Sequence, residues 1–400
     1  MNLWQSTKNF FMRILPPPVY TFNREINRII SRLDQVEKAL RQAMSTTETN
    51  LSQRQDTLAN TMTNIMDAQK SSGEILSNQI KSIEQLIPNK TILWNNEFER
   101  SVVKGNWGDT SKDPDFREKY LKLISGLDPE SAEIITRIIL RQHKYLNNDA
   151  KSLDLFTRAE QEQLRLLKEE FNDQILRIDD DLYAYKNYLL PIHHFESSVF
   201  YYKHGLAQVD TLDKVKGKAV VDVGGFIGDS VLVLSELQPK VIYTFEAVPE
   251  NFALLQKTLR LNHLNNVIAE NLALGAENST TIIHVGGSSS TGIDRPGLKF
   301  IEDIQVPVTT LDDYVDEHPM EIGLIKVDIE GGEPAFLAGA KKTICDQKPI
   351  LLLSIYHNAH DFYELKPLLE SWGVGYRFRI HKPVFVSATG ETLLLAEVVE

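Results

Sequence analysis

Short apolar segments alternate with amphipathic segments over the second half of the chain. Segments of strand length, rich in valine, leucine and isoleucine, lie at residues 219–223, 241–245, 267–273, 322–327, 350–356 and 392–398. Apolar residues with helical spacing follow at 230–236, 249–261, 311–316, 333–342 and 361–372. This alternation predicts an α/β fold with a doubly wound, mostly parallel sheet and a core over residues 218–400. Ligands of such sheets bind beyond the carboxyl ends of the strands.

The first half of the chain has a helical pattern instead. Apolar residues recur at intervals of three, four or seven over residues 21–87, and amphipathic periodicity returns at 131–145 and 159–176. Gly73 is the only glycine before residue 95, and glycine costs about 1 kcal/mol inside a helix. We predict a coiled coil over 21–90, with a partly disordered helical linker as the alternative. An all-helical domain over 91–190, which we expect to cap the ligand cleft, precedes a third domain over 191–400.

Residues 1–20 form an amphipathic segment. Trp4, Phe10 and Phe11 fall on one helical side, and Lys8 and Arg13 fall largely on the other. Such a helix lies in a membrane interface or packs on protein, and two cations predict only weak membrane contact. No segment has the roughly 18 apolar residues of a membrane span, and no secretory cleavage site follows the N-terminus. The expected location is cytoplasmic, or peripheral at the inner face of a membrane.

The composition of the chain excludes several classes of protein and of site. Hydrophobic residues make up 42% of the 400 residues, as in ordinary globular proteins, and the formal net charge is −12. Residues 1–93 carry a net charge of +3 and the remaining residues carry −15. Because the whole chain is negatively charged, we do not expect it to bind nucleic acid through electrostatic attraction. A single cysteine, Cys345, excludes an internal disulfide and a cysteine-rich metal site. We expect self-association through the coiled coil, because a largely polar helix cannot bury itself alone.

A glycine-rich turn follows the first strand of the predicted sheet. Asp222 ends this strand, and Gly224, Gly225 and Gly228 follow where the backbone must turn tightly and approach a ligand. The dinucleotide fingerprint needs glycine at position 223, where valine stands, so a nicotinamide oxidoreductase is disfavoured. A phosphate-binding P-loop is excluded because no Gly-Lys-Ser/Thr follows.

A second acid lies at the end of the next strand. Glu246 follows the strand at 241–245 and lies 18 residues after Gly228. A carboxylate at this position can accept hydrogen bonds from both hydroxyls of a ribose. Two acid-tipped strands joined through a glycine turn therefore suit S-adenosylmethionine.

Further acids follow the strand at 322–327. Asp328 ends this strand and Glu330 lies two residues on, so an extended chain would place both carboxylates on one side. Both could instead be structural, capping turns, and Asp328 could hold the cofactor or, with Glu330, a divalent ion. His357 follows the strand at 350–356, where it could act as general base, substrate ligand or structural residue. We expect no obligatory metal.

Two other patterns in the chain resemble metal sites. The acidic triplet at 179–181 is better interpreted as a solvated helix end. The adjacent histidines at 193–194 cannot easily face one point in a helix or a strand. The residues 199–202 that follow have a strand-like pattern.

These motifs, in this order and spacing, resemble the FkbM family of S-adenosylmethionine-dependent methyltransferases, whose fold is Rossmann-like. The matching stretches are 221–228 (VDVGGFIG), 244–246 (TFE), 310–314 (TLDDY), 325–331 (IKVDIEG) and 354–357 (SIYH). One departure is Ala247-Val248-Pro249, where members often have proline directly after the acid. The resemblance covers residues 218–400 and extends into the lead-in at 194–205, so that 191–400 is the FkbM-like domain. Nothing carries over to the first 190 residues.

The resemblance implies a cofactor, S-adenosyl-L-methionine, and residues that bind it. Asp222, Gly224, Gly225 and Gly228 would line its methionine part, Glu246 would bind the ribose, and the strand end at Asn271 would border the adenine. It also implies O-methylation of a sugar, glycan or glycolipid acceptor.

Methyl transfer to a hydroxyl benefits from a general base, by roughly 10²–10⁴-fold. The candidates at the active edge are Asp328, Glu330 and His357. The alternative is a coiled-coil tethering or scaffold protein with a degenerate methyltransferase-like domain. The intact set of acids and glycines argues against this alternative.

Overall fold

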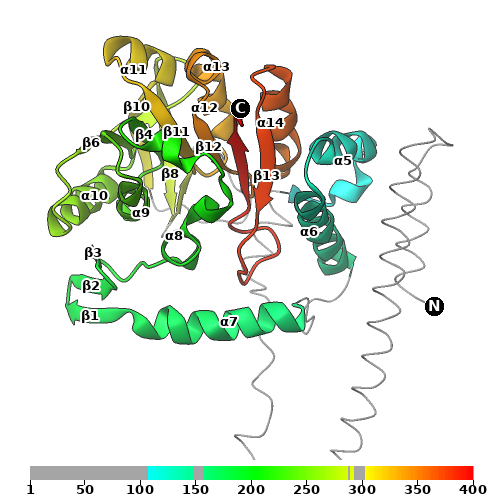
Figure 1. Ribbon diagram of the computed structural model, residues 1–400, viewed down its shortest axis with the longest axis horizontal. Coiled ribbons are helices and arrows are strands. Elements are labelled where there is room, and N and C mark those ends of the chain that lie inside the picture. The colour runs from blue at the N-terminus through cyan, green and yellow to red at the C-terminus, as the bar shows by residue number, and fades with distance from the viewer. Residues whose placement is uncertain (1–106, 148–155, 287–288, 292–301, 400) are drawn as a thin grey trace, which may run out of the picture. The chain divides into compact units, whose positions relative to one another are not determined.

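A seven-stranded sheet forms the centre of the molecule (Figure 1). The computed structural model describes residues 107–147, 156–286, 289–291 and 302–399, which all lie within one compact unit, Thr91–Glu400. The sheet has the order β13-β14-β12-β11-β4-β5-β6. Its strands are β4 (Ala219–Val223), β5 (Val241–Phe245), β6 (Val267–Glu270), β11 (Ile322–Val327), β12 (Ile350–Ser354), β13 (Arg377–His381) and β14 (Leu393–Glu397). The strands from β12 to β6 are parallel, and β14 is antiparallel to both of its neighbours, so the mostly parallel sheet is confirmed.

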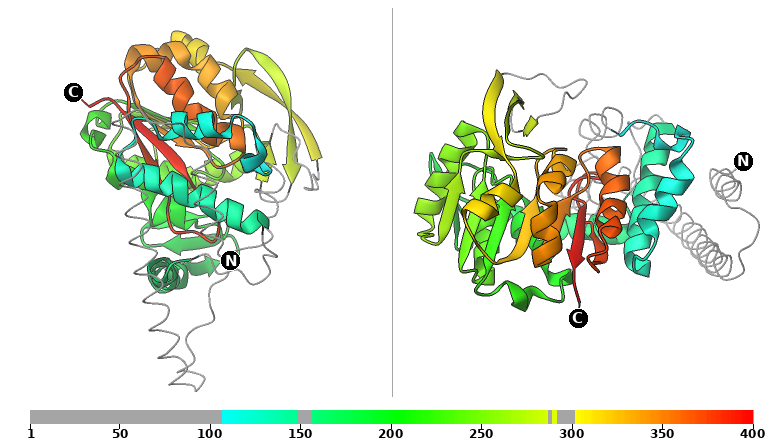
Figure 2. Two further views of the ribbon diagram at one scale, coloured as in Figure 1. Left: turned by 90° about the vertical axis from the view of Figure 1, so that its right-hand side faces the viewer. Right: turned by 90° about the horizontal axis from the view of Figure 1, so that it is seen from above.

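Helices cover both faces of this sheet, as the doubly wound prediction requires (Figure 2). On one face, Ile242 of β5 shares a buried cluster with Val231 of α9 (Asp229–Leu234), and α10 (Pro249–Leu261) lies beside it. On the other face, the ring of Tyr314 contacts Phe245 of β5 with ring centroids 5.0 Å apart. Tyr314 belongs to α11 (Leu311–Glu317), which packs with α12 (Glu333–Gly339) and α13 (Lys341–Gln347), and α12 also packs with α14 (Ala359–Ser371). Ile242 and Phe245 are an odd number of residues apart in β5, so their side chains point to opposite faces and contact different helical layers.

Part of the predicted helical domain packs on one edge of the sheet, beside β13. Its helices are α5 (Phe116–Ile124), α6 (Pro129–Asn147) and α7 (Arg158–Glu170). In Figure 1, α5 and α6 lie beside α14 and β13. The Ser131 hydroxyl of α6 accepts a hydrogen bond of 2.9 Å from the Ile380 amide of β13, which occupies part of an otherwise open strand edge. Trp107 donates a hydrogen bond of 3.0 Å from Nε1 to the Tyr356 carbonyl oxygen.

The predicted coiled coil at 21–90 and the amphipathic segment at 1–20 lie outside the described residues. Within the ranges that the structure describes, every helix is too short or too polar to cross a membrane.

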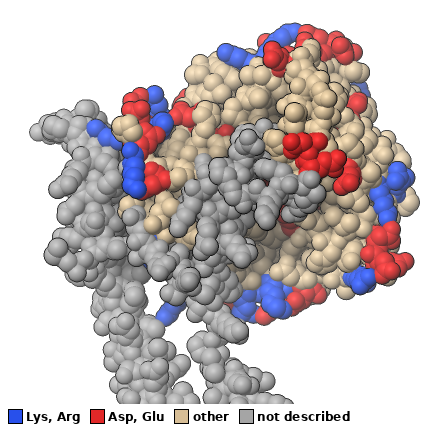
Figure 3. Space-filling model, turned by 180° about the vertical axis from the view of Figure 1, so that it is seen from behind, with Lys and Arg blue, Asp and Glu red and all other residues tan. Residues whose placement is uncertain are grey.

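The all-helical interpretation of 91–190 is wrong for its last part. After α7 come a 3₁₀ turn and an antiparallel sheet of β1 (Leu176–Asp179), β2 (Leu182–Tyr185) and β3 (Tyr188–Leu190). Leu176 and Ile178 alternate with charged residues at a period of two, which is a strand signal. The acidic triplet therefore lies at the turn between β1 and β2, not at a helix end, and Asp181 pairs with Lys257 of α10. Acidic and basic side chains also lie next to one another on the face that Figure 3 shows.

A second, four-stranded sheet is inserted between β6 and α11. Its order is β7-β10-β8-β9, formed by β7 (Ala273–Leu274), β8 (Ser279–Gly286), β9 (Ser289–Thr291) and β10 (Glu302–Thr309). The segment predicted as one strand at 267–273 is thus divided between two sheets. The β-branched run at 280–283 was a signal for β8 that the sequence interpretation did not use.

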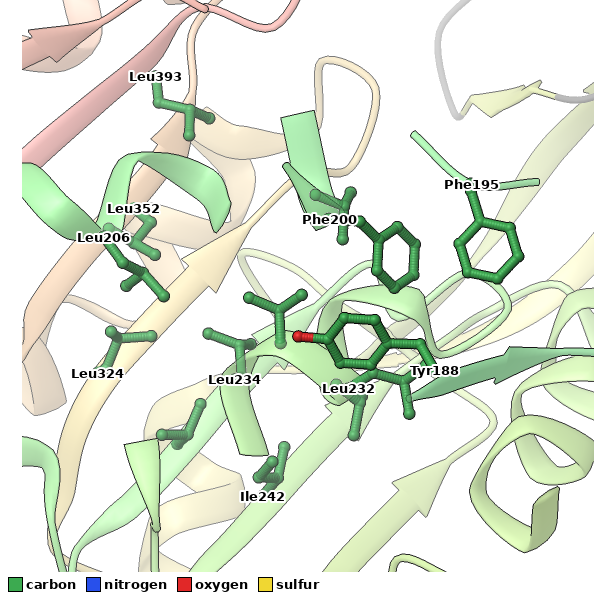
Figure 4. Close-up of a cluster of buried hydrophobic side chains, with 14 of the residues drawn as sticks. Tyr188, Phe195, Phe200, Leu206, Leu232, Leu234, Ile242, Leu324, Leu352 and Leu393 are labelled. Atoms are coloured by element: carbon green, nitrogen blue, oxygen red, sulfur yellow. The ribbon is translucent and has the colours of Figure 1, made fainter. Parts of the chain in front are cut away.

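The segment that precedes β4 contributes to the core of the α/β fold. Figure 4 shows the aromatic rings of Tyr188, Phe195 and Phe200 in one cluster with leucines and an isoleucine of the sheet and of α9. Phe200 belongs to α8 (Ser197–Phe200), so the strand expected at 199–202 is a short helix. Burial of three consecutive residues, 198–200, outweighs their preference for strand. Each buried aromatic or leucine side chain contributes about 1.5–3 kcal/mol, which joins this segment to the sheet.

We predict that the Glu397→Gln variant loses about 1–3 kcal/mol of unfolding free energy at pH 7. Glu397 is 4% exposed, and its carboxylate accepts hydrogen bonds from the amides of Asp210 and Thr211 and from Arg377. Burial raises the pKa of Glu397, but these donors outweigh it and hold the pKa below the usual value. The carboxylate therefore stabilises the fold above the pKa of the unfolded chain, and this stabilisation is lost as pH falls through the folded-state pKa.

Urea denaturation of both proteins between pH 4 and pH 8 measures this difference in stability. The exposed Glu317→Gln variant is the control and should change stability by less than about 0.5 kcal/mol. An equal loss of stability at every pH would contradict the role given to the Glu397 charge.

Candidate active site

A cavity of about 850 Å³ lies at the carboxyl ends of the central parallel strands. Its wall includes Gly224 after β4, Glu246 after β5, Asp328 and Glu330 after β11, and His357 after β12. These five residues were all predicted from the sequence. The cavity occupies the position in which open α/β sheets bind their ligands.

The turn after β4 contacts the loop after β11 through backbone atoms. Gly224 has a φ of +84°, and a Cβ at this position would lie 2.0 Å from the carbonyl oxygen of Asp328. The Asp328 amide donates a hydrogen bond of 3.0 Å to the Val223 carbonyl oxygen. Only glycine fits at position 224, because any side chain would separate the two loops. The other two predicted glycines, Gly225 and Gly228, lie behind this turn and are not among the described residues that line the cavity.

Asp222 lies beneath the cavity and is fully buried. It accepts a hydrogen bond of 2.9 Å from the Thr244 hydroxyl, and its carboxylate lies 3.3 Å from Nζ of Lys326. Burial raises the pKa of Asp222, against the opposing effects of Lys326 and Thr244. The position of Asp222 indicates that it holds the cavity floor, and contact of its side chain with the methionine part of a cofactor stays a prediction.

Lys326 was missed by the sequence interpretation. Its ammonium group pairs with Asp222 and donates a hydrogen bond of 2.9 Å to the Gly224 carbonyl oxygen. Burial lowers the pKa of Lys326, but the negative charges of Asp222 and Asp328 outweigh burial and raise it. The available signal was a lysine inside β11, a strand in which every residue is buried.

Glu246 is 7% exposed and is held by the backbone around it. One carboxylate oxygen accepts a hydrogen bond of 2.8 Å from the Phe226 amide, and the other accepts one of 2.8 Å from the Val248 amide. Burial raises the pKa of Glu246 to about 7, even though these hydrogen bonds favour the charged form. Asn271 donates from its side chain to the Glu246 carbonyl oxygen, so it positions this loop and does not line the cavity among the described residues.

His357 is 3% exposed and lies between carboxylates on both sides of its ring. Its Nε2 is 3.2 Å from Oδ1 of Asp328 and 3.7 Å from Oε2 of Glu330. Burial lowers the pKa of His357, but the carboxylates outweigh it and raise the pKa well above 6.5. Burial also raises the pKa of Asp328, which His357 and Lys326 nevertheless lower to about 2. The structure therefore brings together the three residues that the sequence identified as catalytic candidates.

The conformation that joins Asp328 to Glu330 differs from the expected one. Glu330 has a φ of +59° and Gly331 a φ of +101°, so the chain turns here and is not extended. A left-handed conformation costs a residue with a side chain roughly 1–2 kcal/mol. The carboxylates of Asp328 and Glu330 both still approach Nε2 of His357. The predicted proximity of the two carboxylates is therefore correct, but it results from the turn and from the neighbouring strand, not from an extended chain.

Glu333, the first residue of the segment predicted as a helix at 333–342, contacts the other side of His357. It is fully buried, and its Oε1 lies 3.1 Å from Nδ1 of His357 and accepts a hydrogen bond of 2.9 Å from the Ile329 amide. Burial, together with Glu333, raises the pKa of the neighbouring Asp361 to about 8. An acid in the first turn of a helix is usually exposed, so the local pattern around Glu333 carries no signal for this role.

The cavity wall is strongly acidic. Among the described residues, one lysine, Lys326, faces seven acids: Glu196, Asp229, Glu246, Glu277, Asp328, Glu330 and Glu391. Burial and the charge of Glu196 raise the pKa of Asp229 to about 6 and that of Glu391 to about 8. A concave surface with this charge favours a cationic ligand.

The remaining wall is less charged and comes from the inserted sheet and the loop before β14. It includes Thr281 and Ile283 of β8, Val308 of β10, and Phe385. Within the described ranges, α5, α6 and α7 contribute no residue to the wall, so the expected cap over the cleft is not formed by them.

Comparison with known proteins shows that this part of the chain is similar to methyltransferases. Residues 222–378 match the model of the methyltransferase FkbM domain. The chain is 29% identical over 176 residues to "Methyltransferase 1" of Beauveria bassiana (strain ARSEF 2860), a match that covers 38% of this chain and 71% of that protein.

Solved structures include a methyltransferase FkbM from Methylobacillus flagellatus KT, which is 20% identical with a TM-score of 0.45. That match covers 72% of this chain and 62% of the other chain, which is less than two thirds of its length. Another is SMU.1697c, a putative methyltransferase from Streptococcus mutans in complex with SAH, which is 12% identical with a TM-score of 0.32. This match covers 52% of this chain and 100% of the other. Over the residues that the family model and the fungal protein match, the α/β part of the chain is therefore similar to FkbM methyltransferases.

Proposed function

We propose that this protein transfers a methyl group from S-adenosylmethionine to a hydroxyl oxygen of a sugar, glycan or glycolipid. The observation that carries the proposal is the single acidic cavity in which Gly224, Glu246, Asp328 and His357 meet. Gly224 and Glu246 form its cofactor side, and Asp328 and His357 form its acceptor side.

The cofactor side fits a nucleoside with a positively charged sulfur. Phe226 and Val248 each donate one hydrogen bond to a different oxygen of Glu246, and a carboxylate oxygen can accept more than one. Two adjacent ribose hydroxyls could therefore donate to the Glu246 carboxylate. The bare backbone at Gly224 allows a ligand to approach closely, and the excess of acids suits a sulfonium and an amino group. When bound, S-adenosylmethionine supplies an electrophilic methyl group.

The acceptor side offers groups that can orient a hydroxyl and accept a hydrogen bond from it. Asp328 remains ionised at neutral pH, whereas His357 is protonated because three carboxylates surround it. The Asp328 carboxylate is therefore the better hydrogen-bond acceptor for the hydroxyl. Alignment of the oxygen with the methyl group supplies most of the acceleration, since oriented reactants reach effective concentrations of about 10⁵–10⁸ M.

The scaffold alternative requires a degenerate site. The cavity argues against a degenerate site, because Gly224 leaves its backbone accessible, Glu246 is held by backbone hydrogen bonds, and Asp328 lies next to His357. We also propose, from the heptad-like pattern of residues 21–90, that copies of the chain associate through this segment.

We predict that Glu246→Gln weakens binding of S-adenosylhomocysteine about tenfold to a hundredfold at pH 8, the effect of losing charge-assisted hydrogen bonds. Because the pKa of Glu246 in the free protein is about 7, the ionised form that accepts from the ribose is lost as pH falls. Affinity of the unaltered protein should therefore fall below pH 7, by up to about tenfold per pH unit. This component of the pH dependence should be absent in the glutamine variant.

Calorimetric titration between pH 5.5 and pH 8.5 measures both effects. Glu250→Gln, which changes an exposed acid on the same helix start, is the matched control and should bind normally. Identical affinities and identical pH profiles for the unaltered protein and Glu246→Gln would show that Glu246 does not bind the ribose.

We predict that Asp328→Asn lowers methyl transfer at least tenfold while changing cofactor affinity less than about threefold, because Asp328 acts on the acceptor. The measurement is incorporation of labelled methyl from S-adenosylmethionine into the carbohydrate and glycolipid fractions of an extract of the source cells. Asp303→Asn, an exposed aspartate that contacts His284, is the control. Label that enters only protein or nucleic acid would contradict the proposed acceptor class. Cofactor binding without any transfer would favour the scaffold alternative.

A further inference from the structure

Two buried carboxyl groups meet beside His357, outside the wall of the cavity. Glu333 of α12 is fully buried, and Asp361 of α14 is 1% exposed. The two helices pack together, and the side chain of Asp361 lies within hydrogen-bond reach of Glu333. Neither acid is among the described residues that line the cavity, so both act on a bound ligand only through their neighbours.

Each of these acids has one oxygen with a donor and one oxygen without. Oε1 of Glu333 accepts a hydrogen bond from the Ile329 amide and lies 3.1 Å from Nδ1 of His357. One oxygen of Asp361, Oδ2, accepts a hydrogen bond of 2.6 Å from the Asn358 side chain. In the described part of the chain, Oε2 of Glu333 and Oδ1 of Asp361 are buried without a donor. Two carboxylates in such a contact repel each other unless one of them is protonated.

The surroundings place this proton on Asp361. Glu333 faces the positively charged ring of His357 and a backbone amide, which both favour its carboxylate form. Asp361 faces a neutral donor, Asn358, and Nδ1 of His360 lies 3.7 Å from its Oδ1, beyond hydrogen-bond length. Burial and the charge of Glu333 raise the pKa of Asp361 to about 8, against the opposing effect of His357.

We propose that Asp361 is a neutral acid that donates a hydrogen bond to Glu333, and that this pair holds His357 as the positioning group for Asp328. The chain of contacts continues from Glu333 to Nδ1 of His357, and from Nε2 of His357 to Oδ1 of Asp328 at 3.2 Å. Each donor in the chain points toward the cavity, so one arrangement of protons satisfies all four groups. Such buried networks strengthen each other and fix the orientation of their members.

The consequence for the acceptor rests on the proposed function, whereas the shared proton does not. Asp328 is 28% exposed, so it is the member of the chain that a ligand in the cavity can reach most easily. A carboxylate has about four sites for accepting hydrogen bonds, so the contact with His357 leaves others for an acceptor hydroxyl. Glu333 and Asp361 are positioning residues, because they fix the direction of this carboxylate without contacting the substrate.

Charges from several neighbouring elements bear on this chain. Glu330, which follows β11, lies 3.7 Å from Nε2 of His357 and favours the protonated ring, as Asp328 and Glu333 do. The lysines of the neighbouring elements form ion pairs of their own: Lys326 with Asp222, Lys342 with Asp316, and Lys119 with Asp113. The charge of His357 is therefore the one that Glu333 meets directly.

The pH dependence of unfolding tests the neutral state of Asp361 without any ligand. Because the folded-state pKa of Asp361 is raised, the folded protein binds an extra proton between about pH 4 and pH 8. The unaltered protein should therefore lose stability relative to Asp361→Asn as the pH rises from 5 to 8, since asparagine donates to Glu333 without needing a proton. The urea midpoints of both proteins measure this difference. Asp346→Asn, an exposed aspartate on α13, is the matched control and should follow the unaltered protein. A stability difference that stays constant over this pH range would overturn the proposal.

Nuclear magnetic resonance of the full-length protein with ¹⁵N-labelled histidine tests the next contact in the chain. The His357 signal, assigned by its loss in His357→Gln, should show a hydrogen on both ring nitrogens at pH 7. Glu333→Gln should lower the pH at which the ring loses one of them by about one unit or more. A ring with a single hydrogen at pH 7 in the unaltered protein would contradict the chain of donors.

A pair of substitutions at Asp361 tests the positioning role. Leucine is close to asparagine in size but cannot donate to Glu333, so Asp361→Leu should transfer methyl groups at least tenfold more slowly than Asp361→Asn. Both variants should bind S-adenosylhomocysteine with affinities within about threefold of each other. Equal transfer by the two variants would overturn the positioning role.

Circular dichroism checks that each variant folds. Should Asp361→Leu fail to fold, the urea and resonance measurements on the unaltered protein and on Asp361→Asn still decide whether the proton is shared. If these measurements agree with expectation while the unaltered protein transfers no methyl group, only the proposed function is rejected. Methyl transfer by a protein whose Asp361 is ionised at pH 7 would reject only this inference.

Discussion

The buried ion pair between Asp222 of β4 and Lys326 of β11 supports the whole cavity. It joins two adjacent strands at their carboxyl ends, and Lys326 extends the link to the carbonyl oxygen of Gly224. Loss of one partner from a buried pair costs about 3–5 kcal/mol, because the remaining charge is left in an apolar environment. The pair therefore fixes the distance between the glycine turn and the loop that carries Asp328, where the two backbones touch.

An excess of negative charge distinguishes the cavity from the rest of the molecule. On the surface, as in Figure 3, acidic and basic residues lie beside one another, whereas one lysine faces seven acids among the described cavity residues. Burial raises the pKa values of Glu246, Asp229 and Glu391, and the charge of Glu196 adds to this effect at Asp229 and Glu391. A cationic cofactor in the cavity would relieve this excess of negative charge.

The folded body is larger than the region that matches the family. The match ends at residue 378, yet β14 beyond it is inserted between β12 and β13. Before the match, Tyr188, Phe195 and Phe200 share the hydrophobic cluster of the sheet (Figure 4). Trp107 reaches the carbonyl oxygen of Tyr356, the residue before His357. The start of the described chain thus contacts the strand end that carries His357, whereas α5, α6 and α7 contribute no described residue to the cavity wall.

The sequence by itself determined the parallel strands, their order of alternation with helices, and the residues at their ends. Strand periodicity and glycine at turns are local properties, so Gly224, Glu246, Asp328 and His357 could be identified without a structure. Only the tertiary structure decided that β14 runs antiparallel, that the strand-like segment at 199–202 is helical, and that Lys326 and Glu333 reach the site. The contacts of a lysine within a strand or a glutamate within a helix depend on which elements are neighbours in space, and the local pattern of burial does not encode that.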